Sequence, residues 1–348
     1  MKHGKIGQQT TDKGQLATDH GQLTTDHGQR TLITDPMKLI FCGTPQFAVP
    51  PLERLIAEKH DIELVMTNPD EPSGRGYEVK PSPVKLAALK AGLEIFQPLK
   101  LKEDSTARFL SKFRPDSIVV VAYGHIIPKW MIDLPKHGCI NLHASLLPKY
   151  RGAAPVQWAL MRGESVTGVT TMKIDEGLDT GDILLRREVA IQDDDTAETL
   201  SQRLSVAGAE LMAETLPKFI RGEIQPQPQD HAQATFAPLL KKEDGRIDWG
   251  LEAKEIGWRV RGLRPWPGAY TTFRGRNLHI WSAAPGAGQA EPGLEPGTLL
   301  PERGTLRVVC GRGTLLEVHE LQLEGRKRLP TGDFLNGVHI AADEKLGH

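Results

Sequence analysis

Cysteine is scarce in this sequence: its 348 residues contain only three, Cys42, Cys139 and Cys310, which lie far apart. They form neither a disulfide framework nor a CxxC metal site, so the sequence predicts a protein of a reducing cytoplasm. No apolar run approaches the roughly 18 residues of a membrane span. The longest, Ile118 to Tyr123, has the length of a strand. A large net charge is also absent, since 43 basic residues face 44 acidic ones. This balance argues against a protein that coats nucleic acid, although a local basic surface remains compatible with it.

The first 36 residues differ from the rest of the chain. Residues 11–31 read TDKGQLA, TDHGQLT and TDHGQRT, a repeat with a period of seven. A coiled coil needs two apolar positions in each heptad, whereas here one position is apolar in two of the three copies and every copy has a Gly. The segment also lacks the apolar stretch of a secretory signal. The sequence therefore predicts a disordered extension over residues 1–36 and a translation start at Met37.

From Met37 onward, apolar runs alternate with stretches of helical spacing. The runs predict strands over residues 38–43, 61–68, 93–98, 116–124 and 138–145, with helices between them. Such alternation predicts an α/β fold with a doubly wound, Rossmann-like parallel sheet. Two β-rich runs within residues 167–191 and a long helix ending near Arg221 complete a first domain, which we expect to span residues 37–223.

The composition changes after residue 223. Residues 224–245 are polar and without periodicity, which is typical of an interdomain linker. Residues 246–340 then contain five short runs of strand character broken by Gly and Pro, which predicts a small closed or partly open β-barrel of the OB type. From residue 246 to the last residue there are 14 basic and 12 acidic side chains, a balance that permits contact with nucleic acid without requiring it.

Three polar residues form the candidate catalytic site. Asn141 and His143 are two positions apart on a predicted strand, so their side chains share one face. The strand runs directly into SLLPKYRGAAP, which places both at its carboxyl end, where open α/β sheets bind ligands. Asp179, in a GLDTGD turn, can orient the imidazole and favour its charged form. Together these groups can stabilise a tetrahedral intermediate and carry a proton.

No side chain is equally well placed as a nucleophile. Ser145 lacks the GxSxG elbow of serine hydrolases, and Cys139 precedes Asn141 on the same strand, so the pattern favours direct attack by the substrate. Other readings stay open at this stage. The Asn-x-His pair could anchor a loop, Asp179 could cap a turn, and Asp182 could be the functional acid instead.

Longer motifs resemble the folate-dependent formyltransferase family. These are LIFCGTPQFAVPPLERL near the start, GCINLHASLLPKYRGAAPVQWALMRGE with TGVTTMKIDEGLDTGDIL in the middle, and EDGRIDW and RPWPGAY near the end. The resemblance implies that Asn141, His143 and Asp179 form the active site. It implies folate contacts from Ser145, Leu146, Leu147 and Pro148. The implied reaction moves a formyl group from 10-formyltetrahydrofolate to the α-amino group of methionine on initiator tRNA, without a metal ion.

The same resemblance implies a contact with tRNA through the loop NPDEPSGRGYEVKPSPVK, in which the Arg of GRG is Arg75. The loop departs from the family pattern at Glu71, where relatives have Arg, and at residues 77–79, where relatives are basic. Its local charge is therefore less positive, which weakens phosphate contacts. Residues 326–328, which read RKR, are a second candidate contact with RNA, although the pattern favours an ordinary solvated surface there.

Other functions remain to be compared with this one. A purine-pathway ribonucleotide or a nucleotide-linked amino sugar could be the formyl acceptor, but the predicted barrel and the GRG loop favour tRNA. A nonenzymatic RNA-binding module is a further alternative. An NAD-binding protein is disfavoured because GTPQFAVP replaces the GxGxxG that follows the first strand of such proteins. We expect a cytoplasmic monomer without a membrane segment.

Overall fold

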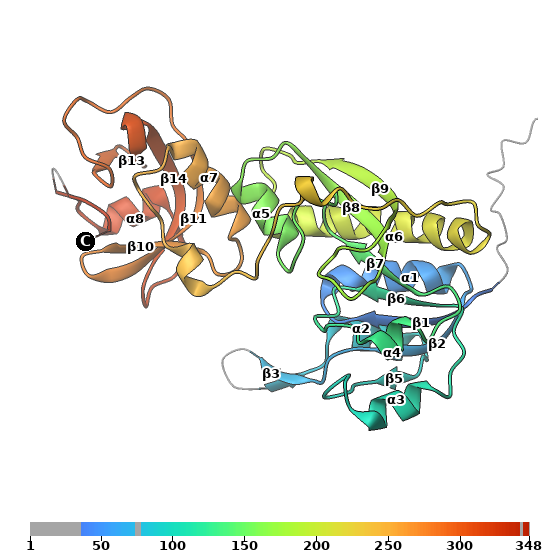
Figure 1. Ribbon diagram of the computed structural model, residues 1–348. Helices are drawn as coiled ribbons and strands as arrows, with labels where there is room; N and C mark the ends of the chain where they lie inside the picture. Colours follow the sequence, from blue (N-terminus) through green and yellow to red (C-terminus); the bar gives the residue numbers. More distant parts are fainter. Residues whose placement is uncertain (1–35, 74–77, 342–343, 348) are drawn as a thin grey trace, which may run out of the picture. The chain divides into compact units, whose positions relative to one another are not determined.

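The computed structural model describes residues 36–73, 78–341 and 344–347 (Figure 1). Residues 1–35 of the predicted extension and the proposed tRNA contact Arg75 lie outside these residues. Within them, the chain forms a seven-stranded mixed sheet with helices, followed by a six-stranded antiparallel sheet. The combination of an α/β layer structure and a small β-domain agrees with the fold class expected from the sequence.

The first sheet has the strand order β5-β2-β1-β6-β7-β8-β9. Its strands are β1 Lys38–Gly43, β2 Asp61–Met66, β5 Ile95–Phe96, β6 Ser117–Val121, β7 Cys139–His143, β8 Val166–Lys173 and β9 Ile183–Ala190. The five strands from β5 to β7 are parallel, whereas β8 and β9 are antiparallel to their neighbours. The short connection between β8 and β9 accounts for their pairing, since a parallel crossover needs a dozen or more residues.

The antiparallel course of β8 decides where the next turn begins. His143 pairs with Thr170, and Ile140 pairs with Lys173, so β8 ends beside the amino-terminal half of β7. The turn that carries Asp179 therefore has to fold back along β7 to reach His143. The sequence predicted two β-rich runs around this turn but not their antiparallel direction.

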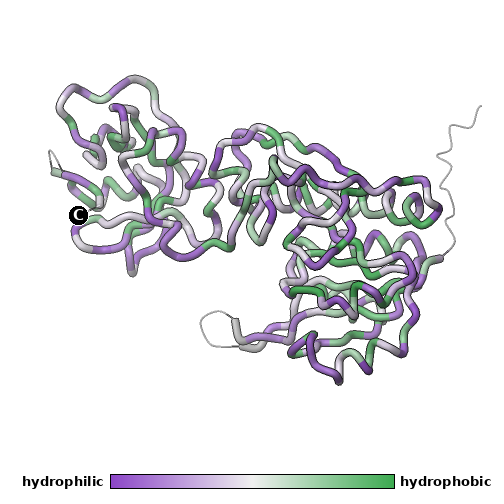
Figure 2. Tube along the Cα trace, in the orientation of Figure 1, coloured by the Kyte–Doolittle hydropathy of each residue, from purple (hydrophilic) through white to green (hydrophobic). Residues whose placement is uncertain are grey.

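Helices cover both faces of the sheet, and the side chains of β1 accordingly pack in alternation into two hydrophobic cores. Leu39 and Phe41 join the cluster that contains the buried side of helices α1 and α6, whereas Ile40 and Cys42 join the cluster with α3 and α4. The helices are α1 Val49–Ala57, α2 Pro83–Lys90, α3 Asp104–Leu110, α4 Lys129–Ile132, α5 Pro155–Met161 and α6 Ala197–Ile220. Hydrophobic stretches coincide with the central strands (Figure 2), as expected for a sheet buried on both sides.

The loop after β2 contains a short hairpin of β3 Glu71–Ser73 and β4 Glu78–Lys80, which extends beyond the sheet (Figure 1). Its base is anchored by Asp70, which accepts hydrogen bonds from Lys85 Nζ at 2.5 Å and from Gln97 Nε2 at 2.9 Å. The hydrogen bond from Lys85 is the main cause that lowers the pKa of the Asp70 carboxyl. The hairpin starts at the carboxyl edge of the parallel strands, the same edge at which β7 ends.

The second sheet has the order β10-β11-β14-β13-β12, with β15 paired to β14. Its elements are β10 Ala269–Phe273, β11 Arg276–Pro285, β12 Leu299–Glu302, β13 Thr305–Val309, β14 Leu315–Leu323 and β15 Leu329–Pro330, with helices α7 Ala253–Gly262 and α8 Thr331–Gly337. Along β11, Leu278, Ile280 and Ala283 point into one core with α7. That core is separate from the two cores of the first sheet.

The last described residues connect the two edge strands of this sheet. Leu299 N in β12 donates to Glu344 O at 2.8 Å, and Gly347 N donates to Thr272 O in β10 at 2.9 Å. Residues 344–347 thus bridge β12 to β10 by backbone hydrogen bonds. None of the helices in the described part of the chain is long and apolar enough to cross a membrane.

Candidate active site

Strand β7 presents two polar side chains because its residues alternate between the faces of the sheet. Ile140 and Leu142 pack into the core with α6, while Cys139 joins the opposite core with α3 and α4. Asn141 and His143 follow Cys139 on that opposite side, nearer the carboxyl end of the strand. The strand therefore carries a thiol at its buried beginning and two polar groups toward its carboxyl end.

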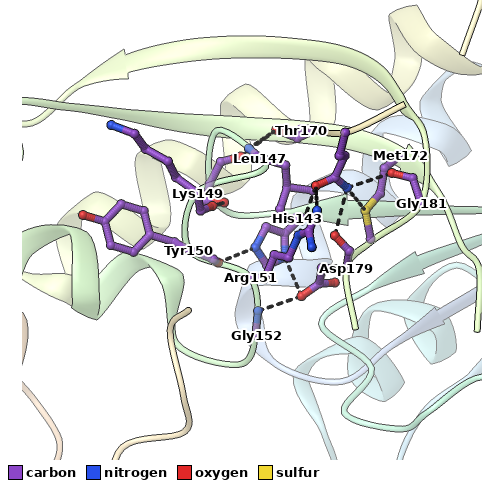
Figure 3. Close-up of polar contacts among 12 residues, drawn as sticks. His143, Leu147, Lys149, Tyr150, Arg151, Gly152, Thr170, Met172, Asp179 and Gly181 are labelled. Carbon is purple, nitrogen blue, oxygen red and sulfur yellow. Dashed lines mark hydrogen bonds and ion pairs between the residues drawn. The ribbon is translucent and has the colours of Figure 1, made fainter. Parts of the chain in front are cut away.

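His143 lies between two acceptors (Figure 3). Its Nε2 is 2.9 Å from the carbonyl oxygen of Tyr150, and its Nδ1 is 3.6 Å from Asp179 Oδ2. The first distance is a hydrogen bond, whereas the second is an electrostatic contact too long for one. Because the Tyr150 carbonyl oxygen can only accept, the proton in that hydrogen bond lies on Nε2. The side chain of His143 is 7% exposed, which strengthens its attraction to Asp179.

Asp179 is aimed at His143 by the local structure of its turn. Its φ of 52° is left-handed, a conformation that Asp adopts more readily than most residues. Asp175 braces the turn by accepting hydrogen bonds from Gly177 N and from Thr180 Oγ1. Gly181 is required because a Cβ there would lie 1.8 Å from Lys173 O. The GLDTGD motif thus provides the sharp reversal that returns Asp179 to β7.

A second contact fixes the Asp179 carboxylate. Its Oδ2 accepts a hydrogen bond of 2.8 Å from Gly152 N, in the loop that follows β7. The carboxylate of Asp182, the other acid considered from the sequence, forms no hydrogen bond or ion pair among those found in the described residues. Of the two acids, the structure brings Asp179 to the imidazole.

Asn141 is the open member of the group. Its side chain is partly exposed and takes no part in the hydrogen bonds found within residues 36–73, 78–341 and 344–347. Its amide N–H is therefore free to donate to a ligand at the sheet edge. This availability agrees with a site for a ligand better than with a loop-anchoring pair, which would use the amide internally.

The SLLP segment, Ser145 to Pro148, forms a tight turn beside β8. The Ser145 hydroxyl donates to Lys149 O at 2.6 Å, and Thr170 Oγ1 both donates to Ser145 O and accepts from Leu147 N. Leu147 is buried, whereas Leu146 and Pro148 are partly exposed. The Ser145 hydroxyl is fully buried and serves the turn, so it is not placed as a nucleophile.

The thiols are equally unsuited to nucleophilic chemistry. Cys42, Cys139 and Cys310 are all buried. Burial raises the pKa of Cys139 to about 12 and, as its largest cause, that of Cys310 to about 12 as well. The pKa of Cys42 is also raised by burial. Since the thiolate is the reactive form, these residues are structural.

A segment that the sequence reading treated as a linker also reaches the site. The side chain of Gln229 is buried and hydrogen-bonded to Arg151, to Asp179 O and to Gly181 O. Hydrophobic periodicity could not have identified Gln229 as buried. Its side chain is polar, and the residues before it alternate between Gln and Pro. In the described part of the chain, no group of three His, Cys, Asp or Glu side chains could hold a metal ion.

Comparison with known families identifies the family to which the chain belongs. The family model described as formyl transferase matches residues 37–216, and the model of its C-terminal domain matches residues 239–339. The α/β sheet with a small β-domain is thus that of a one-carbon group transferase, and the chain belongs to the formyl transferase family. Within that family, relatives 55% and 54% identical to the chain are methionyl-tRNA formyltransferases, which places it among them.

The relatives that place it there are similar over nearly their whole length. The chain is 55% identical over 312 residues to the methionyl-tRNA formyltransferase of Koribacter versatilis, covering 89% of this chain and 99% of the relative. It is 54% identical to that of Acidobacterium capsulatum, again over 312 residues, covering 89% of this chain and all of the relative.

Solved structures share the fold at lower identity. HypX from Aquifex aeolicus in complex with tetrahydrofolic acid has a TM-score of 0.59 at 19% identity, covering 89% of this chain; the match spans 50% of HypX. An N-formyltransferase from Helicobacter canadensis, in complex with folinic acid and dTDP-3-aminofucose, has a TM-score of 0.62 at 17% identity, covering 81% of this chain and 98% of that one. At these identities the likeness concerns the fold alone.

Proposed function

We propose that this enzyme transfers the formyl group of 10-formyltetrahydrofolate to the α-amino group of methionine on initiator tRNA. The observation that carries the proposal is the arrangement at the end of β7, where the Asn141 amide shares a strand face with the buried His143, which in turn faces the partly exposed Asp179. The names of the relatives above, all at more than half identity, support tRNA as the acceptor.

The reaction needs a neutral amine, a stabilised oxyanion and a route for one proton. The amine nitrogen attacks the formyl carbon, and the carbonyl electron pair moves onto the formyl oxygen. Asn141 donates a hydrogen bond to that oxygen, and protonated His143 adds its positive charge. The bond from the formyl carbon to folate nitrogen then breaks, and that nitrogen takes a proton while the amine loses one. Asp179 holds His143 and accepts the amine proton through water.

The SLLP turn is our candidate for the folate contact. Ser145, Leu146, Leu147 and Pro148 directly follow the strand that carries Asn141 and His143, so a ligand against this turn has its reactive end near both. Thr170 braces the turn at two backbone positions, which makes it a rigid wall. The folate derivative is a co-substrate, so the enzyme needs no bound metal in this scheme.

We assign separate tasks to the domains. Residues 37–223 perform catalysis, residues 224–245 join the domains, and residues 246–340 assist in binding tRNA. The hairpin of β3 and β4 begins at the same edge of the sheet as the site, which supports a contact of this loop with the tRNA acceptor end. The residue that we propose for the contact, Arg75, lies outside the described residues. We further propose that the enzyme acts as a cytoplasmic monomer.

A comparison of acceptors tests this function. Purified enzyme is supplied with 10-formyltetrahydrofolate and, in parallel, with methionyl initiator tRNA, a nucleotide-linked amino sugar or an amino-bearing ribonucleotide. We expect N-formylmethionyl-tRNA as the only substantial product. Preferential formylation of a sugar or ribonucleotide would overturn the tRNA assignment and leave formyl transfer intact, whereas no transfer to any acceptor would overturn both.

A further inference from the structure

The segment from Gln227 to Ala237 is hydrogen-bonded to both loops of the site. At one end, Gln227 and Ile183 exchange backbone hydrogen bonds of 2.9 and 2.8 Å, which fixes the segment to the start of β9. At the other end, Arg151 N donates to Thr235 O at 2.8 Å, and Ala237 N donates to Arg151 O at 2.7 Å. The segment therefore connects the Asp179 turn to the loop after β7.

Gln229 joins the same two loops through one side chain. Its Oε1 accepts from Arg151 Nε at 3.1 Å and Arg151 Nη2 at 2.6 Å, and its Nε2 donates to Asp179 O at 2.9 Å and Gly181 O at 2.7 Å. A primary amide has two donor hydrogens and two acceptor positions, so every hydrogen-bonding capacity of Gln229 is used. The residue is 5% exposed, and its burial makes these bonds costly to lose.

The buried guanidinium of Arg151 depends on the side-chain amide of Gln229 for its hydrogen bonds. Its residue exposure is 4%, and it forms none of the ion pairs found in the described residues. Its side-chain contacts are Gln229 Oε1 and, at 3.2 Å, His231 Nδ1. A buried guanidinium without a carboxylate needs uncharged acceptors to remain buried. Gln229 thus stabilises Arg151 within the loop that also contains Tyr150 and Gly152.

Both partners of His143 are connected to Gln229. On one side, Gln229 holds the Asp179 carbonyl and with it the left-handed backbone that aims the carboxylate. On the other side it holds Arg151, whose neighbours in the chain are Tyr150, the partner of His143 Nε2, and Gly152, a donor to Asp179 Oδ2. A change at Gln229 therefore alters both neighbours of the imidazole.

We propose that Gln229 is a positioning residue for formyl transfer, which sets the distance between Asp179 and His143 without contacting the substrate. This inference rests on the proposed function. Since a misplacement of about 1 Å can lower a rate about a hundredfold, loss of Gln229 should lower kcat by roughly 10- to 100-fold. The KM for folate should stay within about twofold, because the SLLP turn has its own brace in Thr170.

Two variants and a control in the same segment test the proposal. Gln229→Leu removes both sets of hydrogen bonds. Gln229→Glu keeps acceptors for Arg151 but loses both donors to the carbonyls of Asp179 and Gly181. Gln227→Leu is the matched control, because the Gln227 side chain is exposed and its bonds to Ile183 are made by the backbone. We expect both Gln229 variants to be slow and the control to match the wild type.

A double-mutant cycle with Asp179→Asn separates positioning from general structural loss. If Gln229 acts through Asp179, Gln229→Glu should cost less than about threefold in kcat once the carboxylate is gone. Full additivity of the two losses, or normal turnover of Gln229→Glu alone, would overturn the proposal. If Gln229→Leu does not fold, Gln229→Glu carries the same cycle. An inactive wild type would refute the proposed function and this inference together, whereas an active wild type with active Gln229 variants would refute this inference alone.

Discussion

At the scale of residues, the site depends on the pairing of His143 and Asp179. The distance of 3.6 Å between Nδ1 and Oδ2 leaves the two side chains close together but not joined by a hydrogen bond. A water molecule or an incoming amine can therefore approach the carboxylate without first breaking a strong bond. The second nitrogen is held by Tyr150 O, so the ring keeps its orientation during such an approach.

The sequence was sufficient to propose Asn141, His143 and Asp179, because strand alternation and position at a strand end follow from local pattern. It was not sufficient for Arg151 and Gln229. Their roles depend on a buried polar contact between segments 78 residues apart in the chain, and such a contact leaves no periodic signal. The sequence likewise could not decide whether Asp179 or Asp182 faces His143, because this depends on how the turn folds back along β7.

A first prediction concerns the thiols. With a pKa of about 12, Cys139 and Cys310 are thiolates at pH 8 to roughly one part in ten thousand. The folded enzyme should therefore show almost no reaction with a disulfide reagent at pH 8, and it should release three thiols per chain after denaturation. Rapid labelling of the folded enzyme, accompanied by loss of activity, would contradict the structural assignment of these cysteines.

At the scale of elements, the long helix α6 supports the strand that carries the site. Gly208 faces Leu142 so closely that an added Cβ would lie 2.6 Å from the leucine side chain. Leu142 sits between Asn141 and His143, so the position of β7 depends on this helix. The periodic leucines of α6 made the helix predictable, whereas the antiparallel β8 and β9 were not predicted, because strand direction leaves no local signature.

The start of α6 offers a prediction of stability. Thr196 Oγ1 accepts from Thr199 N, and Thr199 Oγ1 accepts from Thr196 N, which forms a capping box. Thr196→Ala removes the acceptor and should lower the free energy of unfolding by about 1 kcal/mol. Thr196→Ser keeps the oxygen and should lose much less. Urea denaturation of the three proteins measures the difference, and equal stability of the Ala and Ser variants would argue against the cap.

The hairpin of β3 and β4 carries a prediction about tRNA. Arg75→Ala should weaken use of methionyl-tRNA more than use of folate, since we expect Arg75 to meet the tRNA. If the contact is with a phosphate, the slope of log affinity against log salt should fall by about one. A salt titration of tRNA binding measures this. An equal loss of activity with a small amine acceptor would show that Arg75 does not act through tRNA.

At the scale of the whole molecule, the family models begin at residue 37 and end at residue 339. The seven-residue repeat lies before this range and has Gly in each copy. A shortened chain beginning at Met37 should therefore show the same melting temperature and the same kcat as the full chain. A clear drop in either would show that the first 36 residues contribute to folding or catalysis.

The sequence predicted an α/β sheet followed by a small β-domain, but it did not predict the path of the segment between them. Residues 224–245 were expected only to connect the α/β sheet to the β-domain. Part of this segment is instead hydrogen-bonded to Arg151, in the loop after β7, and to Ile183, at the start of β9. The closing contribution of residues 344–347 to the β-domain was also missed, because four residues are too few to show strand periodicity.

The central claim is that Asn141 stabilises charge that appears only in the transition state. The most direct measurement is the single-turnover rate of Asn141→Ala with saturating 10-formyltetrahydrofolate and methionyl-tRNA, together with its Kd for folate and its unfolding curve. We predict a rate about 10²- to 10³-fold below that of the wild type, with unchanged folate affinity and fold. A near-normal rate in a folded variant, or a loss explained entirely by unfolding, would contradict the account.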